Sequence, residues 1–159
     1  MILKYTSNVP PEQTIAEITK CLVRHGASAI MTDYDKGTGK ATALTFKMPL
    51  GDKSLSFRLP CDWQPVYAIL TAGVKFNSRD EQRNVERKER YREQAERTAW
   101  RILKDWVEAQ IALVETTMTT APLVFLPYAV MKDGHTLSEK VAQTPQFLLG
   151  DGNLHENGD

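Results

Sequence analysis

The side chains best suited to chemistry are basic residues that recur at helical spacing through the middle of the chain. They lie three, four or seven residues apart, which places them on one face of a helix. The members are Arg83, Arg87, Arg90, Arg97, Arg101 and Lys104. Guanidinium groups make planar, paired hydrogen bonds to phosphate oxygens, so the stripe predicts an anion-binding surface. The candidate ligand-binding residues are Arg90, Arg97, Arg101 and Lys104, with Trp100 as an adjacent aromatic wall.

An acidic stripe lies next to this basic one and offers a second interpretation. Its members are Glu86, Glu89, Glu93 and Glu96. Glutamates four residues from arginines, as in Glu86–Arg90, stabilise a solvent-exposed helix and partly cancel the field of the arginines. The alternative to a binding surface is therefore a solvated helix face.

No other pattern in the chain predicts catalysis or metal binding. His25, His135 and His155 are isolated from one another, and Cys21 and Cys61 have no metal-ligand spacing. Gly37–Lys40 lacks the full phosphate-loop motif and lies between two predicted strands, so we interpret it as a hairpin turn. We expect no catalytic residues, no metal ligands and no cofactor.

The first half of the chain predicts a helix followed by three strands. Thr14 and Glu17 form a capping-box motif after Pro10–Pro11, and Gly26 provides the end of that helix. Alternation of apolar and polar residues predicts strands over 27–34, 41–48 and 55–59, with turns at 35–39 and 49–52. A helix packed on a three-stranded antiparallel meander is a two-layer α+β unit.

The second half predicts helices. Asp62 is placed to cap a short helix that ends near Gly73, and the segment from about Asp80 to about Thr116 contains no proline or glycine. That segment predicts one long charged helix. Its second half becomes apolar over most of its circumference at Trp100, Val107, Ile111 and Val114, so it needs cover from the C-terminal segment or from a second subunit. Residues 121–128 carry two prolines and predict a short helix or turn on the core, and 137–143 a last short helix.

Composition limits the class of protein. The chain has 159 residues, 42% of them hydrophobic, with 20 basic and 20 acidic residues and no apolar run long enough to span a bilayer. A uniformly basic nucleic-acid protein is disfavoured, whereas a local basic patch is compatible with these numbers. We expect a single domain over 1–149, a mobile tail over 150–159, a reduced cytoplasmic location and no membrane partner.

The segment Glu96–Gln110, the Phe125–Leu–Pro–Tyr128 motif, Gly134 and Thr136–Leu137 resemble a family of small bacteriophage and prophage proteins. The resemblance runs from the first helix through Leu137 and implies a phage origin. The family has no agreed activity, so the resemblance implies no catalytic residues.

The resulting hypothesis is a non-enzymatic phage accessory protein, with a counter-defence role among the options. It would act as a homodimer or higher oligomer that binds an anionic nucleotide or nucleic acid through the basic stripe. An open stripe would favour a polyanion, whereas an enclosed pocket would favour a small nucleotide. One alternative is an inhibitor of a host protein that uses the apolar face from Trp100 to Val114. The other is a small phosphodiesterase in which a histidine meets Arg97 or Arg101 in one cleft.

Overall fold

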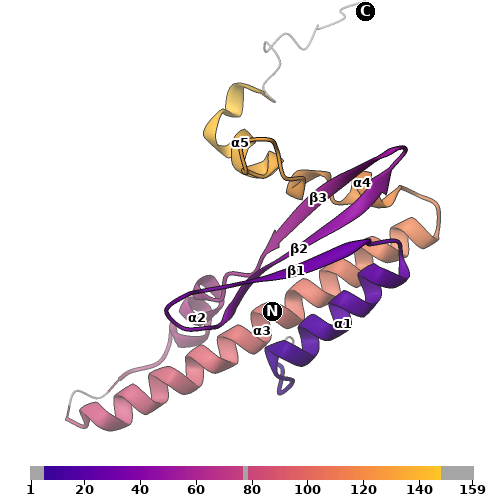
Figure 1. Cartoon of the computed structure of the whole chain (residues 1–159). Coiled ribbons are helices and arrows are strands. Elements are labelled where there is room, and N and C mark those ends of the chain that lie inside the picture. Colours follow the sequence, from indigo (N-terminus) through magenta and orange to yellow (C-terminus); the bar gives the residue numbers. More distant parts are fainter. Residues whose placement is uncertain (1–5, 77–78, 148–159) are drawn as a thin grey trace, which may run out of the picture.

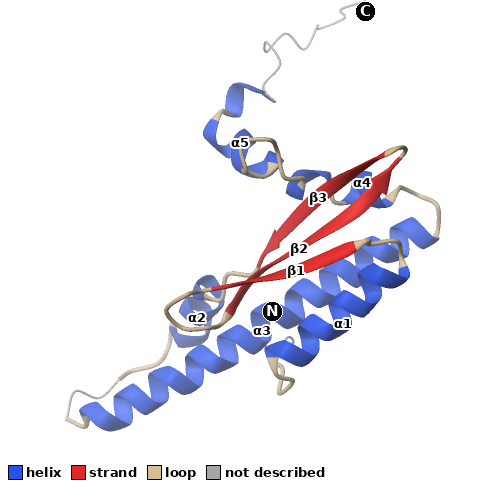
Figure 2. Cartoon of the chain, in the orientation of Figure 1, coloured by secondary structure: helices blue, strands red, loops and turns tan. Residues whose placement is uncertain are grey.

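The protein is an α+β fold in which two helices cover one face of a three-stranded sheet (Figures 1 and 2). A computed structural model describes residues 6–76 and 79–147, and the tail predicted over 150–159 lies outside them. The first elements are α1 (Pro11–Arg24), β1 (Ala29–Tyr34), β2 (Ala41–Leu50), β3 (Lys53–Pro60) and α2 (Gln64–Thr71). The later elements are α3 (Glu81–Glu115), α4 (Ala121–Val124), the 3-10 turn η2 (Leu126–Tyr128), α5 (Leu137–Gln143) and a final 3-10 turn at Pro145–Phe147.

Helix α1 begins three residues before the predicted capping box. Pro11 occupies its first turn, where a missing N–H costs no intrahelical hydrogen bond. Thr14 is therefore inside the helix, buried, with its hydroxyl donating to the Pro10 carbonyl. The prediction that Thr14 caps the helix is wrong, whereas Gly26, at a φ of 101°, ends the helix region as predicted.

The three strands form the predicted antiparallel meander in the order β1-β2-β3. The predicted turn at 49–52 is shorter than expected, because Pro49 and Leu50 continue β2 and pair with Ser54 and Lys53. β1 pairs with β2 only as far as Lys47, so the missing N–H of Pro49 removes no bond on that side. The turn then narrows to residues 51–52, with Gly51 at a φ of 61°.

The core lies between the inner face of the sheet and helices α1 and α3. The inner-face side chains of β2 and β3 are almost fully buried, as are Ile18 and Leu22 of α1. Phe125 closes this layer from the C-terminal segment, with ring centroids 5.2 Å from Phe46 and 5.8 Å from Trp106. The predicted packing of residues 121–128 on the core is confirmed, and the mechanism is this aromatic cluster.

The long helix α3 is continuous, with Asp80 capping it through a hydrogen bond from the backbone N–H of Arg83. In its second half Trp100, Val107 and Ile111 are at most 3% exposed. These side chains belong to the same cluster as residues of α1, the sheet and α4, so the chain itself covers this apolar face. No helix in the described parts of the chain combines the length and apolarity needed to span a membrane.

The N-terminal part of α3 projects beyond the sheet and beyond α1 (Figure 1). It lies beside α2 and residues 75–76, and Lys40 of the β1–β2 turn is 3.9 Å from Glu89 within it. We call residues 81–92 of α3 the arm. The hydrophobic cluster includes α3 residues only from Ala95 onward. The arm is therefore stabilised mainly because it continues a helix that is anchored in the core, and less by burial of its own side chains. This arrangement puts most of the arm's charged side chains in solvent, with Arg87 and Arg92 only partly exposed.

Candidate functional site

The arm carries a row of arginines on one side of the helix, which we call the basic face and define as Arg83, Arg87 and Arg90. The Arg83 side chain is 77% exposed, and Arg90 is exposed as well. Arg87 is half-buried because its guanidinium lies over the Phe76 ring, 5.5 Å from the ring centre, and donates to the Lys75 carbonyl. The arginines therefore line the open side of a projecting helix.

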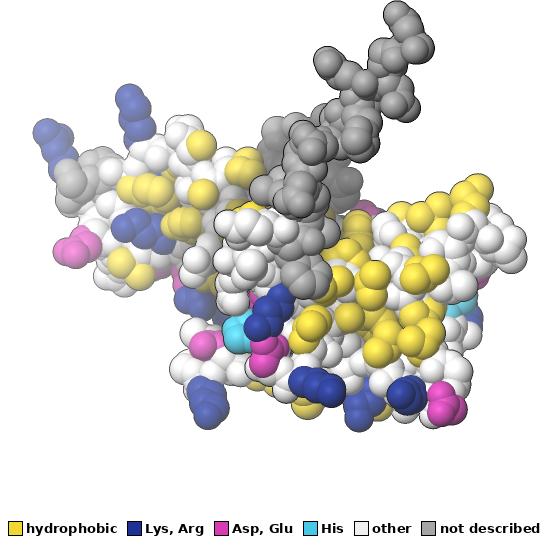
Figure 3. Space-filling model, turned by 90° about the horizontal axis from the view of Figure 1, so that it is seen from above, with side chains coloured by type: hydrophobic (Ala, Val, Ile, Leu, Met, Phe, Trp, Pro, Cys, Tyr) yellow, Lys and Arg dark blue, Asp and Glu magenta, His cyan; other side chains and the backbone are white. Residues whose placement is uncertain are grey.

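Charge is distributed unevenly between this end of the molecule and the rest. Residues 75–92 contain seven basic and four acidic residues, a net of three positive charges. Because the whole chain is formally neutral, the remaining residues carry a net of three negative charges. Figure 3 shows Lys and Arg side chains projecting from the end of the molecule that holds the arm.

The other predicted site residues lie further along α3, and two of them hold α1 in place. Arg97 donates from Nε to the Ser7 carbonyl at 3.2 Å, just before α1 begins. Lys104 pairs with Glu17 of α1 at 3.4 Å and with Glu108 at 2.9 Å. These bonds, led by that to Glu108, raise the pKa of Lys104. Lys104 thus joins α3 to α1, and Arg97 joins α3 to the segment just before α1.

Trp100 and Arg101, the remaining predicted site residues, differ from each other in exposure. Trp100 is 2% exposed and belongs to the core, although it contributes to the wall of a cavity. Arg101 is 44% exposed and pairs with Asp105 at 3.0 Å. Of the five predicted ligand-binding residues, Arg90 and Arg101 reach open solvent and do not lie in one enclosed pocket.

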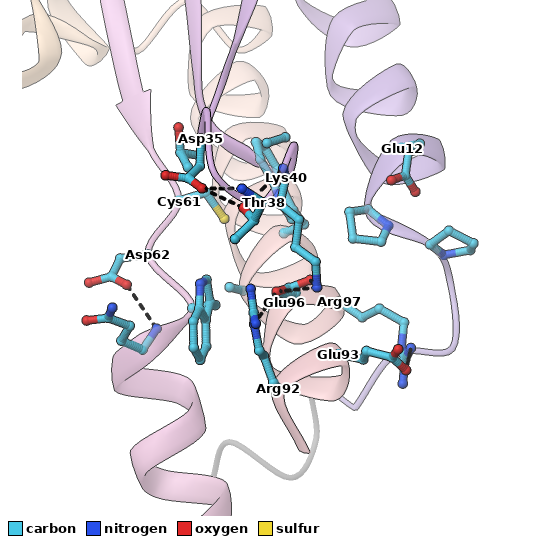
Figure 4. Close-up of a pocket in the computed structure, with 18 of the residues that line it drawn as sticks. Glu12, Asp35, Thr38, Lys40, Cys61, Asp62, Arg92, Glu93, Glu96 and Arg97 are labelled. Atoms are coloured by element: carbon cyan, nitrogen blue, oxygen red, sulfur yellow. Dashed lines mark hydrogen bonds and ion pairs between the residues drawn. The ribbon is translucent and has the colours of Figure 1, made fainter. Parts of the chain in front are cut away.

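A cavity of about 730 Å³ lies where the β1–β2 turn, the start of α1, the start of α2 and the middle of α3 meet (Figure 4). We refer to it as the cavity. It lies beside the base of the arm, and its wall includes Arg97 and Trp100 together with residues that sequence reasoning missed: Lys40, Arg92, Glu96 and Trp63. These four come from three separate segments, so only the fold brings them together.

A three-residue ionic cluster crosses the cavity wall. Lys40 donates from Nζ to both carboxylate oxygens of Glu96 at 2.8 Å. Arg92 reaches the same carboxylate at 3.3 Å, and its guanidinium lies 5.1 Å above the Trp63 ring. Glu96 is only 11% exposed, and the two cations compensate its burial. The cluster ties the β1–β2 turn to α3.

The histidines and cysteines do not form a catalytic arrangement among the described residues. His25 bridges helix ends, with Nδ1 2.7 Å from the Cys21 carbonyl and Nε2 2.8 Å from Glu115. The backbone hydrogen bond and the Glu115 carboxylate raise its pKa. Burial raises the pKa of the Cys61 thiol to about 12, which disfavours a thiolate nucleophile.

His135 lies two residues before α5, and its Nδ1 is 3.5 Å from a carboxylate oxygen of Asp133. Neither the cavity described above nor a second one beside Trp106 and Tyr128 has a histidine in its wall. His155 lies outside the described residues.

No protein-family model matches the chain, and no curated protein or solved structure is significantly similar to it.

Proposed function

We propose that the protein is a non-enzymatic accessory protein that binds nucleic acid through the basic face of its arm, in the cytoplasm of a host cell. One observation carries the proposal: Arg83 and Arg90 are exposed, with the half-buried Arg87 between them, in one row on a helix that projects from the body of the fold. Guanidinium groups bind phosphate through paired hydrogen bonds, and a nucleic acid presents its phosphates in a regular row.

The shape of the basic face favours a polymer over a single nucleotide. Arg83 and Arg90 are seven residues apart, so their helix positions are separated by about 10 Å along the axis. A small ligand binds tightly when walls surround it, and the basic face is an open, convex surface. A strand of phosphates can contact all three side chains at once, which a mononucleotide cannot.

The aromatic residues near the arm favour contact with the phosphate backbone over stacking of unpaired bases. Phe76 and Tyr91 are partly buried and pack against each other, with ring centroids 6.4 Å apart. Single-strand binders usually present free aromatic rings for bases to stack on. The described residues of the arm present none, so we expect duplexes to bind at least as well as single strands, with little sequence preference.

Acidic neighbours limit the strength of this interaction. Glu86 and Glu89 lie within one turn of the basic face and reduce its field. The expected dissociation constant is therefore that of non-specific binding, about 1 to 100 μM at physiological salt. A homodimer would present two basic faces and raise the apparent affinity.

The proposal is tested by fluorescence anisotropy with a short labelled DNA duplex of mixed sequence, with the matching single strand in parallel. Binding that weakens as salt rises supports the proposal. Absence of binding at low salt, or affinity for a mononucleotide equal to that for the duplex, would contradict it.

Contact with a partner protein is a second candidate, favoured by exposed apolar side chains at the other end of the molecule. Figure 3 shows hydrophobic side chains gathered over that half. At the end of β2 and in the segment after α3, Leu50 is 48%, Met118 75% and Leu123 61% exposed. Light scattering of the wild type against Met118→Lys and Leu123→Lys variants tests whether this surface holds a second copy. If the wild type and both variants have the same mass in solution, this surface does not mediate self-association.

A further inference from the structure

The two outer edges of the sheet differ in whether another described segment of the chain covers them. β3 forms one edge, where the backbone N–H of Val130 donates to the Ser56 carbonyl at 2.8 Å. An isolated bridge between Phe57 and Ala129 covers the same edge. β1 forms the other edge and pairs only with β2 (Figure 2). A strand with an unpaired edge offers its backbone groups to a further strand, so β1 is a candidate interaction surface.

The hydrogen-bond pattern identifies the backbone groups of β1 that face this open edge. The Cys61 N–H donates to the Thr42 carbonyl at 2.8 Å, so even-numbered residues of β2 point their backbone groups to β3 and odd-numbered ones to β1. Each of these odd-numbered residues lies opposite an odd-numbered residue of β1, as far as Asp33. Ile30 and Thr32 therefore direct their N–H and C=O groups outward, and neither bonds another segment within residues 6–76 and 79–147.

β1 lacks the features that usually protect an open edge from pairing. Its sequence, Ala29–Tyr34, contains no proline and no lysine, and its one charged residue is Asp33. The irregularity in its pairing with β2 falls between Asp33 and Tyr34, at the end of the strand. Met31 is 57% exposed on the outer face of the sheet. An unprotected edge strand with an exposed apolar side chain is typical of a protein-binding surface.

A second copy of β1 matches this edge when the two strands run antiparallel about a twofold axis at Met31. In that register, Ile30 of each copy lies opposite Thr32 of the other. The outward N–H and C=O groups of these residues then form four hydrogen bonds between the copies. Met31 lies opposite Met31 of the second copy in a non-hydrogen-bonded pair, where side chains of neighbouring strands are closest.

The same register matches charges across the outer face of the sheet. It places Asp33 opposite Ala29 of the second copy, and Ala29 lies beside Lys47 of β2. Because Ala29 is small, Lys47 can extend over it to Asp33 of the other copy, whose Cα is two strand spacings or roughly 10 Å away. Neither Lys47 nor Asp33 forms an ion pair among the described residues. The twofold axis forms this pair twice, and exposed pairs of this kind fix register more than affinity.

We propose that the open edge of β1 binds a second copy of this chain, which joins two three-stranded sheets into one sheet of six strands. Twofold dimers are the commonest homo-oligomers, and they require a surface that complements itself. The contact is small, so we expect a dissociation constant on the order of 10 to 100 μM. The surface is separate from the basic face and from the apolar residues around Met118, and it does not depend on nucleic-acid binding.

Sedimentation velocity of the full chain from about 5 to about 500 μM tests the proposal. We expect the wild type to change from monomer to dimer across this range. Met31→Lys places two like charges opposite each other at the axis and should weaken dimerisation by about tenfold or more. The matched control, Met118→Lys, adds the same charge at an exposed methionine outside the sheet and should dimerise as the wild type does.

A wild type that stays monomeric at about 500 μM would overturn the proposal. A dimer that survives Met31→Lys, or one that is lost in Met118→Lys instead, would assign self-association to another surface and overturn it as well.

A cysteine substitution tests the register separately. Met31→Cys places two thiols opposite each other with Cα atoms about 4.5 Å apart, which is within the range for a disulfide. Oxidation should link this variant into a dimer much faster than the matched control Met118→Cys. The native Cys21 is partly buried and Cys61 is buried, so the wild type provides the baseline. Equal rates of linkage in the two variants would contradict the twofold axis at Met31.

Discussion

Neutralising the basic face should remove the salt-dependent part of nucleic-acid binding and leave the fold intact. The variant is Arg83→Gln, Arg87→Gln, Arg90→Gln. Glutamine has a helix propensity close to that of arginine, and Arg83 and Arg90 are exposed. Loss of the Arg87 contact with Phe76 costs about 0.5 to 1 kcal/mol, which the continuous helix α3 should tolerate.

The size of the effect follows from the number of arginines in the row. Three phosphate contacts predict a slope of about 2.7 for the logarithm of the dissociation constant against the logarithm of salt concentration, at about 0.9 per contact. Raising salt from about 50 to about 200 mM should then weaken wild-type binding by roughly 40-fold, which corresponds to about 2.2 kcal/mol. The triple variant should lose most of this slope.

The assay is anisotropy of a labelled duplex across that salt range, with circular dichroism to confirm helix content. The matched control is Lys36→Gln, Lys47→Gln, Lys53→Gln, which removes the same charge from exposed positions in the sheet and its turns. The control should keep the wild-type slope. An unchanged slope in the arginine variant, or an equal loss in both triple variants, would refute the assignment of the basic face.

Three further predictions concern contacts that hold α1, the β1–β2 turn and the C-terminal segment in place. His25→Gln should destabilise the protein more at pH about 5.5 than at pH about 8.5 in thermal unfolding. The pKa of His25 is raised in the folded state, so the stability that His25 contributes is fully present below the unfolded-state pKa of 6.5. This stability is lost as pH rises through the folded-state pKa. A difference in stability between variant and wild type that does not change with pH would exclude the charged pair with Glu115. Lys40→Met should cost about 1 to 2 kcal/mol because it removes two hydrogen bonds from the nearly buried Glu96, whereas Lys47→Met at an exposed position should be close to neutral. Phe125→Ala should cost about 3 to 5 kcal/mol in urea denaturation, and a much smaller shift would mean that the C-terminal segment is not part of the cooperative core.

Local sequence patterns predicted most of the elements, and their failures have local causes. Absence of proline and glycine predicted the long helix, and alternation predicted the meander. Two capping-box motifs within the described residues have different outcomes. Thr136 and Glu139 form both reciprocal hydrogen bonds at the start of α5, whereas Thr14 lies inside α1. Pro11 supplies a helix start three residues earlier, so the residues preceding the motif decide whether it caps.

The sequence by itself determined the α+β class, the long helix and the direction in which its arginines point, because helical periodicity of 3.6 residues is a local property. Only the tertiary structure decided which arginines remain available. Docking of α1 engages Arg97 and Lys104, while the arm leaves Arg90 in solvent. The cavity likewise depends on pairs such as Lys40 and Glu96, which are 56 residues apart. Side chains that far apart meet only when the whole chain packs, and no local pattern encodes their distance.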